Sequence, residues 1–291
     1  MRVIVHGGAG GTPTDPEARQ RSLDTAATAG SNAGTVVNAV TAALRELESD
    51  PRFNAGTGSA VQSDGYIRTD AGIMRDDRSA GAACGMPGVE HAIDVAEVVR
   101  SETPHVLVSG VHAVDLADAY GIETEADLWT ERTQARWADT DDRPPEGVKA
   151  QTAWVRERFG EPTERDHDTV GAVATDGKRT AAATSTGGRW FALAGRIGDV
   201  PQVGSGFYCA EAGGASATGA GEDIARYTLA RRAVQLLEDG HDAQSAADAA
   251  IGEFDELAAG SAGIIVLTPN DETGSAYNSD SLLTAVAGGL E

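Results

Sequence analysis

The sequence predicts a fold of the α+β class, in which helices and strands occupy separate stretches of the chain. Apolar residues recur at helical spacing in residues 16–47 and 221–257, whereas strand patterns gather in 169–186 and after 262. The strict alternation of strand and helix that builds a parallel sheet is not visible, and neither is an internal repeat. Segregated blocks of this kind are typical of helices stacked as layers on sheets. We expect the 291 residues to form one domain.

The first part of the chain predicts a strand, a glycine turn and two helices. Val3–Val5 is a buried-strand pattern, and the glycine-rich run 7–11 is expected to end it in a tight turn. Helices are predicted over 16–29 and 34–47. A glycine-rich, extended region follows at 53–74 and ends in the segment 67–74. A helix at 93–100, a strand at 105–108 and a helix at 111–120 complete this part.

Residues 121–168 differ in composition from the rest of the chain. They are acidic, contain Pro144-Pro145 and carry no sustained strand pattern, so we interpret them as a polar connector with one helix at 148–159. We expect the end of this connector, 160–168, to be mobile.

A hairpin follows the connector directly. Asp176-Gly177, between strands 169–175 and 179–186, is a strong hairpin signal. Helices are then predicted over 221–237 and 242–257, and strands over 262–267, 274–277 and 282–287.

The charge balance excludes two classes of binding partner and indicates the cellular compartment of the protein. The chain has 23 basic and 45 acidic residues, a net charge of −22, which argues against a nucleic acid or an anionic membrane as partner. No apolar run is long enough to span a bilayer, and the apolar stretch after Met1 is short for a secretory signal. Two cysteines without metal-site spacing fit a reducing cytoplasm. Only Lys149 and Lys178 are lysines, and this depletion together with the acidic excess favours a cytoplasm of high salt over a merely acidic surface.

Two familiar kinds of site do not fit the sequence. The glycine run 7–11 has neither the dinucleotide-binding nor the phosphate-loop spacing. The six histidines form none of the spacings of a catalytic zinc site. No organic cofactor is expected.

The residue that needs explaining is Thr169, which begins a strand straight after the polar connector. A threonine hydroxyl is a weak nucleophile unless a base activates it, and the α-amino group of a chain-terminal threonine can be that base. Its ordinary pKa of roughly 7.7–8.0 suits proton transfer near neutrality. This function would require the chain to be cut before Thr169. From the pattern alone, a threonine that merely starts a strand is the stronger reading.

Eight blocks of the sequence, in order and at matching spacing, resemble the threonine-dependent asparaginases of the N-terminal-nucleophile hydrolase superfamily. These blocks are His6–Gly10, Phe53–Gly58, Thr69–Met74, Thr103–Leu107, Thr169–Ala174, Thr184–Gly188, Gly195–Asp199 and Thr218–Glu222. The resemblance covers nearly the whole chain and implies a four-layer αββα sandwich. It further implies self-cleavage between Asp168 and Thr169 into chains 1–168 and 169–291, which pair as a dimer of αβ units.

The resemblance also implies the parts of a catalytic site. Thr169 matches the nucleophile, and Thr186 matches the threonine that holds and polarises it. Thr218 and Gly219 match an oxyanion hole, which stabilises charge that develops on the substrate carbonyl oxygen. Asn54 matches a supporting asparagine near the nucleophile.

The same resemblance implies how a small substrate is held. Arg196 matches the residue that grips the α-carboxylate, for which a planar guanidinium is well shaped. Asp199 matches the acceptor of the α-ammonium group, joined by the backbone at Gly219 and Gly221. An i,i+3 pair such as Arg196 and Asp199 is more often a surface ion pair, and that alternative stays open.

A loop that resembles the family's sodium site follows the second predicted helix. Backbone oxygens are suitable ligands for a hard cation. The implied ligands are the backbones of Leu47, Glu48, Asp50, Phe53, Ala55 and Thr57.

The implied reaction is hydrolysis of L-asparagine or of β-aspartyl (isoaspartyl) peptides, with release of aspartate. Two alternatives remain. His167-Asp168-Thr169 looks like the glycosylasparaginase branch, because the plant-type branch has glycine before the nucleophile. The other alternative is a ligand-binding protein of the same fold whose chain is never cut.

The carboxylate of Asp168 could also act as the general base for the cleavage itself. The sequence assigns no role to His105 or Cys209.

The acidic, lysine-poor composition generates one prediction about stability. Molar salt screens the self-repulsion of a protein with a net charge of −22, so the melting temperature should rise steeply from low salt to molar salt. A thermal melt in a series of salt concentrations measures this. A melting temperature that stays flat across the series would contradict the high-salt interpretation.

Overall fold

A computed structural model of the protein describes residues 1–140, 143–159 and 169–289. It contains helices and two β-sheets, which confirms a mixed α and β fold. The larger sheet has seven strands in the order β11-β1-β5-β6-β2-β3-β4, and the smaller has four in the order β10-β9-β8-β7. The strands are β1 (Arg2–Gly10), β2 (Thr69–Arg75), β3 (Ala80–Met86), β4 (Leu107–Ser109), β5 (Val170–Thr175), β6 (Thr180–Thr186), β7 (Phe207–Ala210), β8 (Gly213–Gly219), β9 (Ala262–Leu267), β10 (Thr273–Tyr277) and β11 (Ser281–Gly288).

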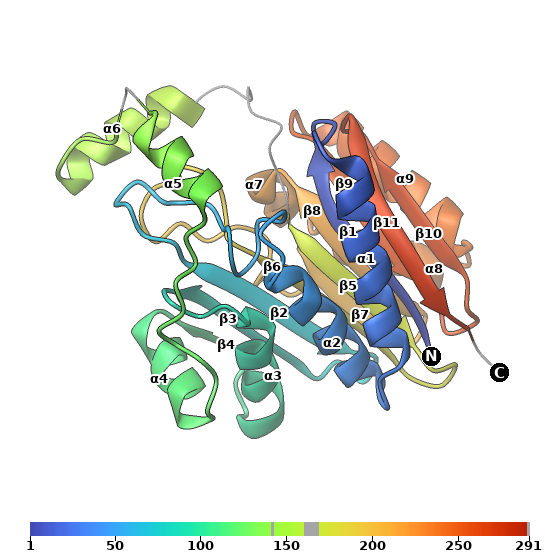
Figure 1. Cartoon of the computed structure of the whole chain (residues 1–291). Coiled ribbons are helices and arrows are strands. Elements are labelled where there is room, and N and C mark those ends of the chain that lie inside the picture. Colours follow the sequence, from blue (N-terminus) through green and yellow to red (C-terminus); the bar gives the residue numbers. More distant parts are fainter. Residues whose placement is uncertain (141–142, 160–168, 290–291) are drawn as a thin grey trace.

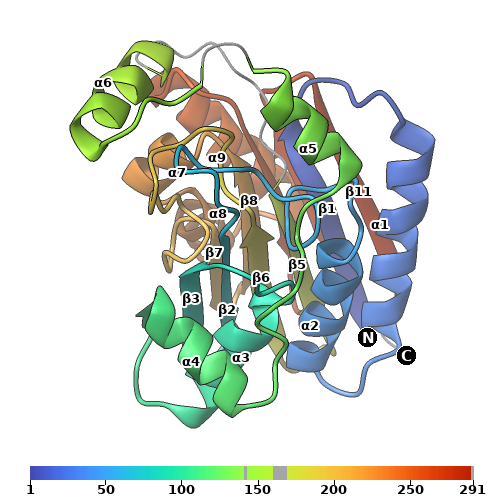
Figure 2. The ribbon, with the colours of Figure 1, turned by 60° about the vertical axis from the view of Figure 1, so that its left-hand side comes forward.

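Helices cover the outer face of each sheet, while the two inner faces meet (Figures 1 and 2). Helices α1, α2 and α3 pack on the larger sheet, and α8 and α9 pack on the smaller one. The helices are α1 (Pro16–Ser31), α2 (Val36–Glu48), α3 (Ala92–Glu102), α4 (Val111–Ala119), α5 (Glu131–Ala138), α6 (Val148–Phe159), α7 (Gly221–Tyr227), α8 (Leu229–Glu238) and α9 (Ala243–Leu257). None of the helices in the described part of the chain combines the length and apolar character that crossing a membrane requires.

Two apolar clusters correspond to this arrangement. The first joins the outer face of the larger sheet to α1, α2 and α3, with Leu44 and Phe53 among its fully buried members. The second runs from the inner face of the larger sheet through the smaller sheet to α8 and α9, and Phe207 lies between the sheets. Helix α2 shows how sequence produces this packing: Thr35 caps its start, and its buried residues line one face.

The predicted hairpin is confirmed, and its register determines where Thr169 lies. Thr175 pairs with Thr180, and the carboxylate of Asp176 accepts the backbone N–H groups of Lys178 and Arg179. Because Val170 pairs with Ser185, Thr169 lies opposite Thr186 at the far end of the hairpin.

The expectation of a tight turn at residues 7–11 is wrong. Strand β1 continues to Gly10 and pairs with β11 on both sides of a register shift between His6 and Ala9. Gly8 absorbs the irregularity with a φ of 104°, a conformation that glycine adopts without strain. The glycines therefore form a bulge inside a strand.

Two further expectations need correction. The helix predicted over 221–237 is divided at Thr228, whose φ of 49° breaks it into α7 and α8. Strands β3, β7 and β8 and helix α5 have no counterpart among the predicted elements. Strands β3 and β8 are built largely from alanine, glycine and serine, which carry little strand propensity, and β7 is only four residues long. Burial between layers stabilises them instead.

The close approach of the sheets at Gly72 generates a stability prediction. A Cβ atom at Gly72 would lie 2.0 Å from Cε1 of Phe207, so Gly72→Ala should overpack the space between the sheets. We expect a loss of about 1–3 kcal/mol in the free energy of unfolding, measured by urea denaturation. The matched control is Gly252→Ala in α9, where a Cβ meets no atom within 4 Å and should stabilise the helix by up to about 1 kcal/mol. Equal midpoints for Gly72→Ala and the native protein would refute this account of the packing.

Candidate active site

Six of the site residues predicted from sequence line one small cavity at the end of the two sheets. The cavity has a volume of about 20 Å³. It is lined by Thr169, Thr186, Gly188, Arg189, Arg196, Gly198, Asp199, Gly219 and Gly221. Thr218, the neighbour of Gly219 in β8, is fully buried beside it. Residues separated by fifty positions in sequence thus meet around Thr169.

The two hydroxyl groups of the predicted nucleophile pair are in contact. The Thr169 hydroxyl donates to Thr186 Oγ1 over 3.3 Å, and the two residues are only 7% and 4% exposed. In the uncut chain the nitrogen of Thr169 belongs to a peptide bond and cannot act as a base. The contact therefore orients the Thr169 hydroxyl, and an amine would become available only if the chain were cut before it.

Asn54 holds the backbone that carries Thr186. Its side-chain amide donates to the carbonyl of Gly188 over 2.6 Å, and its Oδ1 accepts the N–H of Ala60 over 2.7 Å. Its own carbonyl accepts the N–H of Gly187 over 2.7 Å. A Cβ at Gly187 would lie 2.2 Å from the Ser59 side chain, so only glycine permits this approach. Asn54 is placed to position the 186–188 turn.

Thr218 and Gly219 stand where β8 ends. Oγ1 of Thr218 accepts the backbone N–H of Ala9 over 3.3 Å, which leaves its own proton available for donation. Gly219 has a φ of 139°, and a Cβ there would lie 2.3 Å from the carbonyl oxygen of Ser261. The bulge in β1 thus serves the site, because it brings the N–H of Ala9 to Thr218.

Arg196 pairs with Glu222, a residue that sequence reasoning assigned no function. Two hydrogen bonds of 2.8 Å join the guanidinium to the Glu222 carboxylate. Gly198 and Gly221 allow this placement, because a Cβ at either position would lie within 3 Å of the guanidinium. Burial opposes the charge of Arg196, but Glu222, Asp199 and Asp70 outweigh it and raise its pKa. Burial likewise opposes the charge of Glu222, yet the hydrogen bonds and charge of Arg196 lower the Glu222 pKa to about 2.

Asp199 is a buried acceptor next to that guanidinium. Burial raises the pKa of its carboxyl to about 7, against the opposing effect of Arg196. Oδ2 of Asp199 is buried, and no hydrogen bond to it occurs within the described ranges of the chain. An oxygen of this kind suits a ligand ammonium group, which would supply the missing donors.

Asp70 is a second buried carboxyl that sequence reasoning missed. It pairs with Thr186 across β2 and β6, and its Oδ1 accepts the N–H of Gly85 over 2.7 Å. Burial raises the Asp70 pKa to about 7, opposed by the Gly85 N–H and the charge of Arg196. The available signal was an acid flanked by small residues in a strand of the Thr69–Met74 block.

His6 lies beneath the strand of Thr169. Its Nε2 is 2.8 Å from the hydroxyl of Ser216, and burial lowers its pKa to about 3, so the ring is neutral. A Cβ at Gly171 would lie 2.2 Å from that nitrogen, which makes glycine necessary in β5 above it. The first motif of the sequence therefore supports the strand that presents Thr169.

Three further residues named in the sequence analysis are Asp168, for which a role in cleavage is predicted, and His105 and Cys209, to which no role is assigned. Asp168 lies outside the described residues. His105 is exposed, and Cys209 is buried between the sheets, where burial raises the thiol pKa well above its ordinary value. No cluster of three His, Cys, Asp or Glu side chains within 1–140, 143–159 and 169–289 is placed to hold a metal ion.

The loop proposed to hold sodium is closed on itself by backbone contacts. The carbonyl of Glu48 accepts the N–H of Thr57 over 2.8 Å, and that of Asp50 accepts the N–H of Phe53 over 3.1 Å. A Cβ at Gly56 would lie 2.2 Å from the Glu48 carbonyl oxygen. Each carbonyl keeps a second lone pair, so the donor set is compatible with a hard cation.

Comparison with known proteins points to one family. A sequence family described as "Asparaginase" matches residues 1–290. The chain is 40% identical over 258 residues to a plant-type L-asparaginase of Pyrococcus abyssi, covering 86% of this chain and 84% of that protein. It is 37% identical over 296 residues to an isoaspartyl peptidase/L-asparaginase of Bos taurus, covering 98% and 92%. The protein of the same description in Homo sapiens is 35% identical over 297 residues, with the same coverage.

The buried carboxyl of Asp70 generates a prediction about pH. With a folded pKa of about 7 and an unfolded value near 3.8, folded Asp70 holds its proton where the unfolded chain has lost it. Asp70 therefore favours folding at low pH, and that contribution is lost as pH rises from about 4 to 7. Between pH 4.5 and 7.5 the native protein should lose roughly 1–4 kcal/mol more of its unfolding free energy than Asp70→Asn does.

Urea denaturation at the two pH values measures the difference. The control is Asp115→Asn on α4, where the carboxylate is exposed and the change should leave the pH dependence as it is. Parallel pH profiles for Asp70→Asn and the native protein would show that Asp70 does not carry this proton.

Proposed function

The chain belongs to the asparaginase family and is an amide hydrolase, and we propose that its nucleophile is Thr169, freed when the chain cuts itself before that residue. The substrates proposed are L-asparagine and β-aspartyl peptides, in line with the L-asparaginase and isoaspartyl peptidase names of its relatives. One observation carries the proposal. The Thr169 hydroxyl contacts Thr186 in a cavity that also contains Arg196 and Asp199, a pair suited to an amino-acid head group.

The proposed architecture is the four-layer αββα sandwich of the N-terminal-nucleophile hydrolases. Its support is the pair of sheets that meet face to face, with α1–α3 outside one and α8 and α9 outside the other. After self-cleavage, the mature protein with this architecture would consist of chains 1–168 and 169–291. We propose that two such αβ units form the dimer.

In the proposed complex, Arg196 binds the substrate α-carboxylate and Asp199 accepts the α-ammonium group. Glu222 holds the guanidinium in its plane, and the backbone at Gly219 and Gly221 adds contacts to the ammonium end. These contacts fix the head group, so that the β-carbonyl carbon faces Thr169. The cavity of about 20 Å³ in the continuous chain has room for about one water molecule. Cutting the chain beside Thr169 would supply both the space and the amine.

The proposed reaction uses only the residues of this site and one water molecule. Oγ1 of Thr169 attacks the β-carbonyl carbon while its proton passes to the α-amino group of the same residue. The hydroxyl of Thr218 and the N–H of Gly219 stabilise the charge on the carbonyl oxygen, a contribution of about 3–4 kcal/mol for such a donor. The amine returns the proton to the leaving nitrogen, and the amide bond breaks. Water then hydrolyses the acyl ester, which releases aspartate and restores the hydroxyl.

We also propose that the 47–57 loop binds a sodium ion through the backbones of the six residues predicted from sequence. The bound cation would rigidify the loop that carries Asn54, and hence the turn beside Thr186. It would take no part in bond making. A high-salt cytoplasm is the setting we propose, supported by the net charge of −22 and the scarcity of lysine.

Glycosylasparaginase-like hydrolysis and a non-processed binding protein are the two rival functions. The first rests on Asp168, which lies outside the described residues. The second predicts a single intact chain of 29.9 kDa after purification, whereas self-cleavage predicts two shorter chains.

Replacing the nucleophile tests the proposal directly. Thr169→Ala should yield one uncut, folded and inactive chain, because the same hydroxyl begins self-cleavage and substrate attack. Thr169→Ser keeps a hydroxyl and should still yield two chains with residual activity. Mass spectrometry and an asparagine hydrolysis assay measure the two effects. Turnover at the native rate by Thr169→Ala would eliminate the mechanism.

A further inference from the structure

We propose that Gln62 is a positioning residue for the proposed reaction: it holds the backbone on both sides of Arg196 and so determines how tightly the site binds the α-carboxylate of a ligand. The inference rests on the proposed function, in which Arg196 binds that carboxylate. It deepens the function by naming a residue, outside the lining of the Thr169 cavity, that makes the site selective for a free α-carboxylate.

The side chain of Gln62 is bonded to the backbone at Gly195 and Arg196. Its Oε1 accepts the N–H of Gly195 over 2.8 Å, and its Nε2 donates to the carbonyl of Arg196 over 3.3 Å. Gln62 is only 3% exposed, so the two contacts are made inside the protein. The amide therefore bridges the two peptide groups that enclose Gly195 and Arg196.

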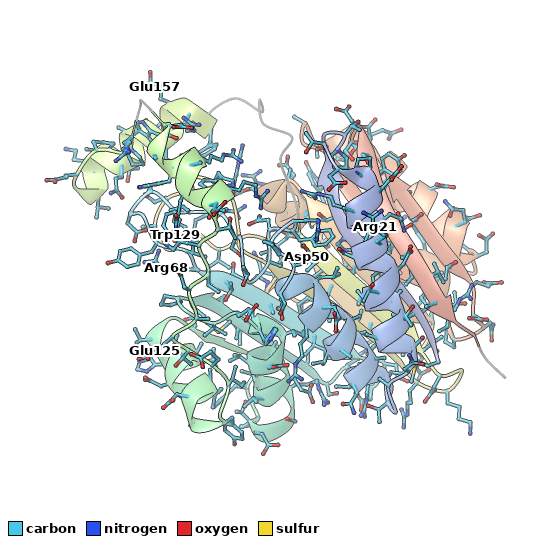
Figure 3. All side chains as sticks on the ribbon, viewed as in Figure 1. Arg21, Asp50, Arg68, Glu125, Trp129 and Glu157 are labelled. Carbon is cyan, nitrogen blue, oxygen red and sulfur yellow. The ribbon has the colours of Figure 1, made fainter. Side chains whose placement is uncertain are left out.

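The partners of the Gln62 amide fix its orientation. Arg68, one of the side chains labelled in Figure 3, donates from Nη1 to Oε1 of Gln62 over 2.7 Å. A guanidinium and a backbone N–H can only donate, and a backbone carbonyl can only accept. Oε1 must therefore face Arg68 and Gly195, while Nε2 faces Arg196. Arg68 is itself held by the carboxylate of Asp64 through hydrogen bonds of 3.1 and 2.8 Å.

Gly195 explains why the backbone of Arg196 depends on this support. Gly195 has a φ of 79°, and a Cβ atom at this position would meet no atom within 4 Å. The conformational freedom of glycine and the open space around it leave the chain free to turn directly before Arg196. At the other end of the arginine side chain, the guanidinium is bonded to Glu222. Gln62 and Glu222 thus hold the two ends of the same residue.

Ser63 anchors the loop that leads to Arg196. Its N–H donates to the carbonyl of Ala192 over 2.8 Å, and its Oγ accepts the N–H of Ala194 over 3.0 Å. In the same loop Phe191 has a φ of 59°, which is unusual for a bulky residue and persists only where the surroundings hold it. The loop is therefore held in its conformation by neighbouring residues.

Loss of the Gln62 amide should loosen Arg196 and leave the reacting groups as they are. A carboxylate bound by a guanidinium in a fork of two parallel hydrogen bonds is sensitive to the direction of that guanidinium. The ligand ammonium group is bound by Asp199 in the proposed complex, and the nucleophile Thr169 lies on another segment. The affinity for an α-carboxylate should therefore fall, whereas a ligand with a neutral group in its place should bind as before.

A matched pair of inhibitors tests the proposal in the mature protein. L-Aspartate carries the α-carboxylate, and its α-amide, isoasparagine, has the same shape without that charge. Gln62→Met keeps the volume of the side chain and removes its polar atoms. The inhibition constant of aspartate in asparagine hydrolysis should rise roughly fivefold or more, and that of isoasparagine should change by less than about twofold. KM for asparagine should rise with the aspartate constant, while kcat stays close to the native value.

Two further variants make the test decisive. Gln235→Met on α8, where the side chain is exposed, is the matched control and should leave both inhibition constants unchanged. Ser63→Ala removes a single hydroxyl group and should raise the aspartate constant about twofold or more, because it releases the same loop.

An unchanged aspartate constant in Gln62→Met would overturn the inference. An equal rise for both inhibitors would also overturn it, because that result indicates a general loss of structure. If Gln62→Met does not mature, Ser63→Ala decides by the same two criteria.

The outcome for the proposed function is separate. Failure of that function would appear as no hydrolysis of asparagine or of β-aspartyl peptides by the native protein. Hydrolysis by the native protein, together with unchanged aspartate inhibition in Gln62→Met, would leave the proposed function standing and remove the role of Gln62 alone.

Discussion

The antiparallel register of β2, β6 and β5 is the constraint on which the site depends. It places Asp70, Thr186 and Thr169 side by side at one end of the larger sheet, on the face that meets the smaller sheet. Directly opposed residues in a sheet have Cβ atoms about 4.5–5.5 Å apart, so one register sets all three positions. A slip by one residue would turn every one of these side chains to the other face.

The charges around Arg196 define which ligand the proposed site would select. One mostly buried guanidinium faces three carboxyl groups. Glu222 is hydrogen-bonded to it, while Asp70 and Asp199 have raised pKa values of about 7. Burial makes a second and third negative charge unfavourable at short range. A ligand that brings an ammonium group would stabilise ionised Asp199, and a ligand carboxylate would share Arg196 with Glu222. The site is thus suited to an entire amino-acid head group.

Small residues make these approaches possible. Gly187 admits the Ser59 and Asn54 side chains, Gly171 admits the His6–Ser216 pair, and Gly221 admits Arg196 and Asp199. In each case a Cβ would lie less than 3 Å from a neighbouring atom. The high glycine content that marks the sequence therefore has a structural cause: the sheets, the bulged strand β1 and the loops converge where the chemistry is proposed.

The sequence by itself determined the mixed fold, the β5–β6 hairpin and most helices, because these follow from local periodicity and turn chemistry. It also determined the family, through motifs whose order carries the information. Only the tertiary structure decided that the 7–11 glycines form a bulge, that Glu222 holds Arg196 and that Asp70 joins the site. These features depend on contacts between residues tens to hundreds of positions apart, and such contacts leave no local pattern in the sequence.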